Sequence, residues 1–146
     1  MNHLKLLLIL LLLPVFSIAQ SADDITGEWL PSNGKGYIKI ERFGSHYYGK
    51  LVWLREPLDP ETKKPKTDRN NPDAAKRNVP LLGYTLLKNF VWDAGDKEWN
   101  GGTIYDPENG KEYSCRIVMK DKNTLDVRGY VGITMFGRSD TWIRKK

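Results

Sequence analysis

The feature that most constrains the fold of this 146-residue chain is a short-range alternation of apolar and polar residues. In the clearest run, residues 112–120, Tyr113, Cys115, Ile117 and Met119 alternate with Glu112, Ser114, Arg116 and Lys120. A period of two is typical of a β-strand that buries one face. After residue 19, no stretch of helical length shows a 3.6-residue period. The chain is therefore predicted to be all-β.

Similar runs recur between turns rich in Gly, Asn, Asp and Pro. The strongest hairpin loop is 106–110, where Pro107 presets φ and Gly110 can adopt positive φ. Gly101 and Gly102 fall inside a run, which indicates a bulge or sharp bend. The expected strands are Gly27–Leu30, Gly36–Glu41, Tyr47–Leu54, Gly83–Trp92, Glu98–Tyr105, Glu112–Lys120, Leu125–Arg128, Ile133–Phe136 and Asp140–Ile143. Eight to nine short strands at hairpin spacing predict an antiparallel up-and-down barrel.

Residues 1–19 read as a signal peptide. Residues 6–16 are apolar apart from Pro14, and this run is too short to cross a bilayer as a helix. Ser17 and Ala19 supply the small residues that a signal peptidase requires. We expect cleavage after Ala19 and a soluble, exported product whose single domain spans residues 20–146. In an exported compartment, nucleic acid is not an expected partner.

Charge and cysteine content narrow the class further. The formal net charge of the whole chain is +5, a mild excess that favours anionic glycans or lipid head groups as partners but steers them weakly. The single cysteine, Cys115, excludes an internal disulfide, so stability has to come from the packed core.

A long connection, residues 55–80, interrupts the strand pattern. It holds five prolines, seven Lys or Arg and five Asp or Glu residues. A connection of this length is either a functional lid or a solvated surface loop. Within it, residues 71–77 fit one helical turn, with Asn71 as the cap and Pro72 at the first position.

The two ends of the mature chain carry residues suited to closing a barrel. In an up-and-down barrel the first and last strands are neighbours, so Trp29 can plug one end while Arg144 lies over its ring. Such a cation–π contact is worth about 0.5–2 kcal/mol. We assign structural closure to four residues: Gly27, Trp29, Trp142 and Arg144.

Several short motifs occur in a fixed order along the mature chain. They are Asn71-Pro72-Asp73 with Arg77, Pro80 to Gly83, Trp99 to Pro107 with Gly110-Lys111 and Tyr113, Arg128 to Gly132, and Gly137-Arg138 with Trp142 and Arg144. In this order the chain, from residue 27 to 144, resembles the bacterial family catalogued as domain of unknown function 2147. The resemblance implies a small exported protein with a lipocalin-like barrel, and no established activity or catalytic residues. It favours the bacterial periplasm, with secretion as the alternative.

The residues offer little for catalysis. His46 is the only histidine after Ala19, and no positioning partner for it follows from spacing. Cys115 lies on the apolar face of a strand and reads as a small core residue. One His and one Cys do not make a typical zinc site, and the Asp68, Asn70 and Asp73 spacing lacks the features of an EF-hand. We predict no enzyme activity, no metal and no cofactor.

The remaining candidates are residues that could line a cavity or its mouth. The aromatic ones are Trp53, Tyr84, Trp92, Trp99 and Tyr105, and the cationic ones are Arg77, Arg128 and Arg138. The aromatic side chains either line a ligand cavity or fill the core. The arginines either orient an amphiphile or form ion pairs that brace loop against barrel.

Two hypotheses follow. The first is a non-catalytic envelope protein that binds a small hydrophobic or amphiphilic ligand in the barrel, with residues 55–80 as its lid. The alternative is a filled-barrel interaction module that docks on an anionic envelope polymer or a partner protein. Ligand identity and oligomeric state do not follow from the sequence.

Overall fold

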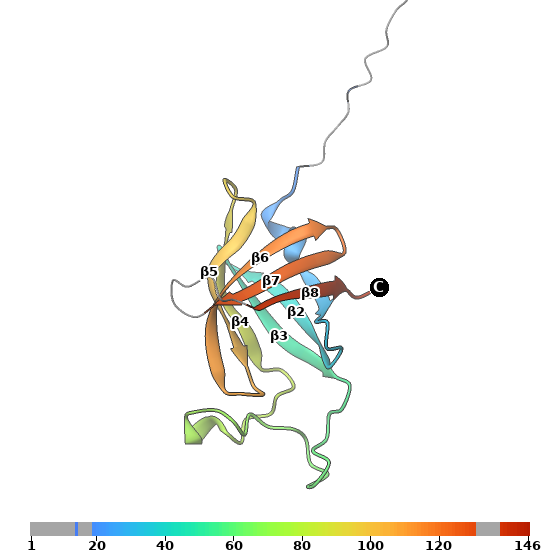
Figure 1. Cartoon of the computed structure of the whole chain (residues 1–146), viewed down its shortest axis with the longest axis vertical. Helices are drawn as coiled ribbons and strands as arrows, with labels where there is room; N and C mark the ends of the chain where they lie inside the picture. Colours follow the sequence, from blue (N-terminus) through green and yellow to red (C-terminus); the bar gives the residue numbers. More distant parts are fainter. Residues whose placement is uncertain (1–13, 15–18, 131–137) are drawn as a thin grey trace, which may run out of the picture.

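The computed structural model describes Pro14, residues 19–130 and residues 138–146. These residues form a closed antiparallel barrel in which each strand pairs with the next and β8 pairs with β1 (Figure 1). The strands are β1 (Gly27–Leu30), β2 (Gly36–Phe43), β3 (His46–Leu54), β4 (Thr85–Asp93), β5 (Glu98–Asp106), β6 (Lys111–Asp121), β7 (Thr124–Tyr130) and β8 (Arg138–Arg144). Two single 3₁₀ turns accompany them, η1 (Ala22–Ile25) and η2 (Ala74–Lys76).

The predicted all-β, up-and-down barrel is confirmed, with eight strands in the described residues. The expected strand Ile133–Phe136 lies outside those residues, as does the predicted signal peptide apart from Pro14 and Ala19. The alternation of apolar and polar residues predicted the positions of the strands because each strand buries one face in the same core. In β6, Cys115 and Ile117 are buried while Ser114 and Arg116 are exposed.

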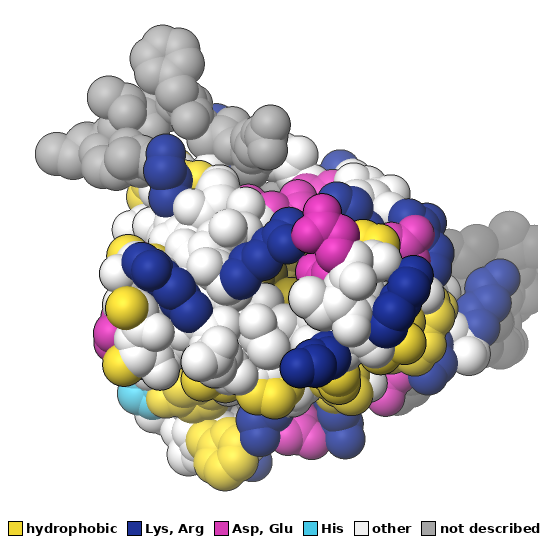
Figure 2. All heavy atoms as spheres, turned by 90° about the horizontal axis from the view of Figure 1, so that it is seen from below, with side chains coloured by type: hydrophobic (Ala, Val, Ile, Leu, Met, Phe, Trp, Pro, Cys, Tyr) yellow, Lys and Arg dark blue, Asp and Glu magenta, His cyan; other side chains and the backbone are white. Residues whose placement is uncertain are grey.

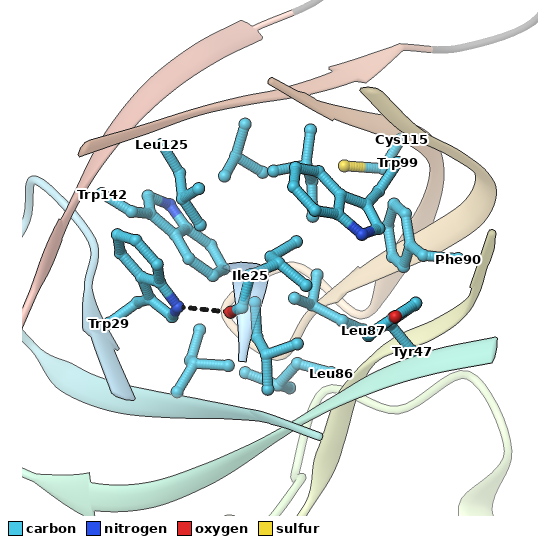
Figure 3. Close-up of a cluster of buried hydrophobic side chains, with 14 of the residues drawn as sticks. Ile25, Trp29, Tyr47, Leu86, Leu87, Phe90, Trp99, Cys115, Leu125 and Trp142 are labelled. Carbon is cyan, nitrogen blue, oxygen red and sulfur yellow. Dashed lines mark hydrogen bonds between the residues drawn. The ribbon is translucent and has the colours of Figure 1, made fainter. Parts of the chain in front are cut away.

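Large apolar side chains fill the core (Figure 3). Trp29, Trp99, Phe90 and Ile25 are at most 1% exposed, and they come from three different strands and from η1. Burying each aromatic side chain removes a large apolar area from water, which compensates for the short strands of a small barrel.

The connections divide between two ends of the barrel. We call the end that carries η1 and the β2–β3, β4–β5 and β6–β7 turns the η1 end. We call the opposite end, with the β1–β2 and β5–β6 turns and the long segment 55–84, the loop end. In Figure 1 the η1 end is at the top and the loop end at the bottom.

The predicted bulge at the paired glycines is present in β5. The β5–β6 register shifts between Trp99 and Gly102, and Gly101 adopts φ of +72°. A Cβ on Gly102 would lie 2.5 Å from a ring carbon of Phe90 and from the Lys88 carbonyl oxygen. Only glycine allows this close approach, which packs the Phe90 ring against the β5 backbone.

Candidate functional site

The η1 end is closed by the short turn η1, which lies across the barrel between two tryptophans. Ile25 of η1 is fully buried, and its carbonyl accepts a hydrogen bond from the indole nitrogen of Trp29 at 2.9 Å (Figure 3). The indole nitrogen of Trp99 donates to the Ala22 carbonyl at 3.0 Å. Both buried indole N–H groups are thus satisfied by the backbone of the plug.

Arg144 seals the same end from outside. Its guanidinium carbon lies 4.2 Å from the ring centroid of Trp29, so the predicted cation–π contact is present. It also donates hydrogen bonds to three backbone carbonyls, those of Asp24, Thr26 and Lys122. A Cβ on Gly27 would lie 2.7 Å from the Arg144 Nη1 atom, so glycine leaves the space that the guanidinium occupies.

Trp142, the fourth predicted closure residue, lies in the core beside Trp29 (Figure 3). Its indole nitrogen donates to the Asp140 carboxylate at 2.9 Å. The interior near η1 is tightly packed. The gap bordered by Ile25, Ile40 and Phe90 holds about 0 Å³ of space for a water molecule.

The interior towards the loop end is less completely covered. Ile104 of β5 pairs with Tyr113 of β6, and both lie on the interior face because the next interior pair is Gly102 with the buried Cys115. Ile104 and Tyr113 are only half-buried, unlike the fully buried side chains near η1. Apolar and aromatic side chains therefore remain partly accessible in this half of the barrel.

Gly129 of β7 adjoins these partly covered side chains. A Cβ there would meet Ile104 Cγ2 and Tyr113 Cβ at 3.5 Å, an ordinary van der Waals distance. Asp140 of β8 pairs with the buried Val127, which places its carboxylate on the interior face as well. This half of the interior thus combines apolar walls, a glycine and one carboxylate.

The loop end also contains a buried polar cluster within the long segment. Asp68 is 0% exposed and accepts a hydrogen bond from the Tyr105 hydroxyl at 2.7 Å and from the Asn71 side-chain amide at 2.7 Å. The same Asn71 amide lies 3.2 Å from the Tyr84 hydroxyl, and the rings of Tyr84 and Tyr105 are 5.6 Å apart. Burial and the neighbouring Asp68 carboxylate raise the pKa of both tyrosines.

This cluster lies on the outer side of the barrel wall. Neighbouring residues of a strand point to opposite faces, so Tyr105 points away from the interior that Ile104 faces. Its cross-strand partner Glu112 is exposed, in agreement with this direction. Tyr105 is nevertheless buried, because Asp68 and Asn71 cover it. The long segment is therefore fastened to the outside of the wall.

Sequence reasoning missed this role of Asp68. The expected alternatives for residues 55–80 were a lid or a solvated loop, and a lone Asp among lysines and arginines gave no signal of burial. The expected helical turn is present as η2, but its cap is Asp73, whose side chain accepts from the Ala75 amide. Asn71 was the wrong cap because its side chain is used by Asp68 and by the Asp73 amide.

The predicted aromatic candidates do not form one set. Trp99 is fully buried in the core, and half-buried Trp92 packs on it with ring centroids 4.5 Å apart. Tyr84 and Tyr105 belong to the Asp68 cluster on the outer wall. Trp53 is 44% exposed on the outer wall. The structure thus distributes these five residues over core, cluster and surface.

The predicted arginines are also dispersed. Arg77 donates from Nε to the Asn71 carbonyl at 2.8 Å, so it braces the long segment internally. Arg128 is half-buried, and its place next to the interior residue Val127 puts it on the outer face of β7. The backbone of Arg138 pairs with Gly129, while its side chain lies outside the described residues.

The two residues weighed for catalysis, Cys115 and His46, lie in different surroundings. Cys115 is buried in the core, and burial raises the pKa of its thiol to about 12. His46 begins β3, half-buried, with its Nδ1 atom 3.3 Å from the Ser45 hydroxyl. In the described ranges, no three His, Cys, Asp or Glu side chains come together as a metal site. None of the helices in those ranges is long and apolar enough to cross a membrane.

The described residues form a closed up-and-down barrel of eight strands, plugged at one end, which is a lipocalin-like fold. A solved structure with this architecture is that of protein HP1028 from Helicobacter pylori, described as belonging to the lipocalin family. It aligns with a TM-score of 0.68 and 21% identity over 83% of this chain and 82% of the other. This likeness concerns the fold alone.

The family model described as "Uncharacterized protein conserved in bacteria (DUF2147)" matches residues 27–144. The chain belongs to this family, and the expected resemblance is confirmed. No curated protein matches the chain.

Proposed function

We propose that this protein is a non-catalytic binder of a small hydrophobic or amphiphilic molecule, held in the half of the barrel that faces the loop end. One observation carries the proposal, namely the contrast between the two halves of the interior. At the η1 end, Ile25 and the two tryptophans that bond to η1, Trp29 and Trp99, are fully buried, whereas Ile104 and Tyr113 are only half-buried. Apolar side chains left partly uncovered inside a barrel are typical of a ligand site.

The chemistry of this half suits an amphiphile. Ile104 and Tyr113 offer an apolar wall, Gly129 keeps side-chain volume low beside them, and the Asp140 carboxylate offers a polar acceptor. Small barrels of about eight strands either fill their interior or hold one small ligand. The lipocalin-like fold is consistent with the second of these. We place the function in the bacterial envelope, after export, with secretion as the alternative.

The second candidate is a filled-barrel module that docks on an anionic envelope polymer or a partner protein. It is favoured by the basic character of the loop end, where Lys and Arg side chains are spread over the face shown in Figure 2. Binding of this kind weakens between low and physiological salt because ions screen exposed charges. Binding of an amphiphile inside the barrel is far less sensitive to salt.

The test is native mass spectrometry of the protein purified from the bacterium that exports it. We expect a discrete mass that is lost when the protein unfolds. A Gly129→Val variant, which adds apolar volume beside Ile104 and Tyr113, should carry less of that mass. A Ser114→Val variant is the matched control, because Ser114 is exposed on the outer face next to the buried Cys115. Equal loads in the two variants would contradict a site in this half of the barrel.

A further inference from the structure

The outer wall carries an amphipathic patch that neither the packing of the core nor the proposed ligand site uses. We propose that this patch docks the protein onto the surface of an anionic lipid bilayer. The outer patch consists of Leu30, Tyr37, Trp53, Ile143, Lys145 and Lys146. The inference goes beyond the proposed function and rests on the outer wall only.

The members of the patch are contiguous although they come from opposite ends of the sequence. A surface hollow of about 340 Å³ lies between β1, β2 and β8 and is lined by Leu30, Tyr37 and Ile143 together with the C-terminal residues 144–146. Tyr37 extends this surface to β3, because its ring lies 5.2 Å from that of its cross-strand partner Trp53. The closure of β8 against β1 brings these residues together.

Two members of the patch, Ile143 and Trp53, are exposed to solvent, while Leu30 and Tyr37 are half-buried. Ile143 lies between the interior-facing Trp142 and the sealing residue Arg144, so alternation places it on the outer wall, where it is 47% exposed. Trp53 is 44% exposed on the same wall. Single exposed apolar residues are ordinary, but an aromatic pair joined to aliphatic side chains around a hollow marks an interaction surface.

Two consecutive lysines, Lys145 and Lys146, border the apolar part of the patch. The Lys145 ammonium lies 5.0 Å from the Tyr37 ring centroid and forms an ion pair with Glu28 at 2.9 Å. The hydrogen bond and the charge of that carboxylate raise the pKa of Lys145. Lys146 is exposed and forms no ion pair within the described part of the chain. Long lysine side chains can lie along apolar surface while the charge stays in water.

Exposed aromatic and aliphatic side chains next to lysines fit the boundary of a bilayer better than a polymer or a protein partner. Trp and Tyr rings partition to the head-group region, where an apolar face and a polar atom are both satisfied. Exposed aliphatic side chains gain by burial at the acyl boundary, and lysine side chains are attracted to an anionic surface. Among the described residues outside the patch, Phe43 is the most exposed aromatic residue; it belongs to β2 at the η1 end and so provides a comparison.

The first experiment is flotation of the exported protein with vesicles of phosphatidylcholine alone or mixed with phosphatidylglycerol. We expect binding to the anionic vesicles and little to the neutral ones. A Trp53→Ala/Ile143→Ser double variant should lose most of this binding, whereas Phe43→Ser should keep it, although Phe43 is the more exposed side chain at 61%. Lys146→Glu should weaken binding more than Lys97→Glu, because Lys97 is exposed in the β4–β5 turn and neither of those strands pairs with β8, β1 or β2.

Intrinsic tryptophan fluorescence gives a second readout, which reports where the protein contacts the lipid and not how tightly it binds. Trp29, Trp99 and Trp142 are at most 2% exposed and Trp92 is half-buried, so Trp53 is the tryptophan that a brominated lipid can approach most closely. Brominated phosphatidylcholine in the anionic vesicles should quench its emission. A Trp53→Phe variant should still float with the vesicles but lose most of the quenching.

Three outcomes would overturn the proposal: equal binding to neutral and anionic vesicles, binding that survives the double variant, or quenching unchanged in Trp53→Phe. Capture by soluble dextran sulfate without flotation on vesicles would also overturn it, and would assign the patch to an anionic polymer. None of these outcomes bears on the ligand mass tested with Gly129→Val.

Discussion

The two ends of this barrel are secured by different chemistry. At the η1 end, large apolar side chains pack together, and the indole nitrogens of Trp29 and Trp99 donate to backbone carbonyls of η1. At the loop end, a fully buried carboxylate, Asp68, holds the long segment against the wall through Tyr105 and Asn71. The first arrangement gains from buried area, whereas the second depends on every hydrogen bond being made.

This difference has a consequence for function. The packed end leaves no space for a ligand beside Ile25, so it serves as a rigid base. The loop end is fastened from outside, which leaves the interior side chains Ile104 and Tyr113 partly accessible. Fastening a long segment to the outer wall therefore keeps the segment in place without filling the interior.

The largest expected effect is at the packed end. Trp29→Ala should lower the free energy of unfolding by about 3–5 kcal/mol, because it creates a cavity and removes the surface on which Arg144 lies. Urea denaturation followed by circular dichroism measures the change. Trp53→Ala removes the same side chain from an exposed position and should cost less than about 1 kcal/mol. Similar losses in the two variants would contradict the rigid-base interpretation.

A smaller effect is expected at the loop end. Tyr105→Phe leaves the buried Asp68 carboxylate short of one donor and should cost about 1–3 kcal/mol. Hydrogen exchange should show faster opening of residues 66–84 while the η1 end stays protected. Tyr47→Phe is the matched control, because Tyr47 donates at 2.6 Å to Asp23, whose carboxylate is largely exposed. Uniformly faster exchange in Tyr105→Phe would argue against a locally fastened segment.

Alkaline pH should weaken both ends through their tyrosines. Burial and the hydrogen bond to Asp23 raise the pKa of Tyr47 to about 12, and burial beside Asp68 raises the pKa of Tyr105. A pKa above the ordinary value of about 10 means that folding favours the neutral phenol. This contribution is complete below pH 10 and is lost as the pH rises through 12. Urea titrations from pH 9 to 12 should show this fall, and a flat profile would contradict it.

The smallest expected effect concerns the chemical labelling of Cys115 and involves no change in the stability of the protein. Burial raises the pKa of the Cys115 thiol to about 12, so iodoacetamide at pH 8 should label the native protein very slowly. Labelling should become rapid in urea. Mass spectrometry of timed samples measures both rates. Rapid labelling of the folded protein would mean that the loop-end half of the interior opens as far as Cys115.

Most of the fold could be predicted from the sequence, because it is written in local patterns. The alternation in residues 112–120 indicates which face of β6 is buried, and the glycine pair at 101–102 marks the bulge of β5. The pairing of Trp29 with Arg144 followed from the rule that the first and last strands of an up-and-down barrel are neighbours. Each of these inferences uses spacing along the chain or one closure rule.

What only the tertiary structure decided is which polar residues leave water. Asp68 resembles the solvated acids around it in sequence, and its burial depends on Tyr105, which lies 37 positions away. The outer patch likewise joins Tyr37 and Trp53 to Ile143 and Lys145 through the closure of β8 on β1. The sequence determined the strands, their faces and the barrel, because side-chain alternation is a local property. Burial of a charge and the joining of distant surfaces depend on contacts that exist only once the barrel has closed.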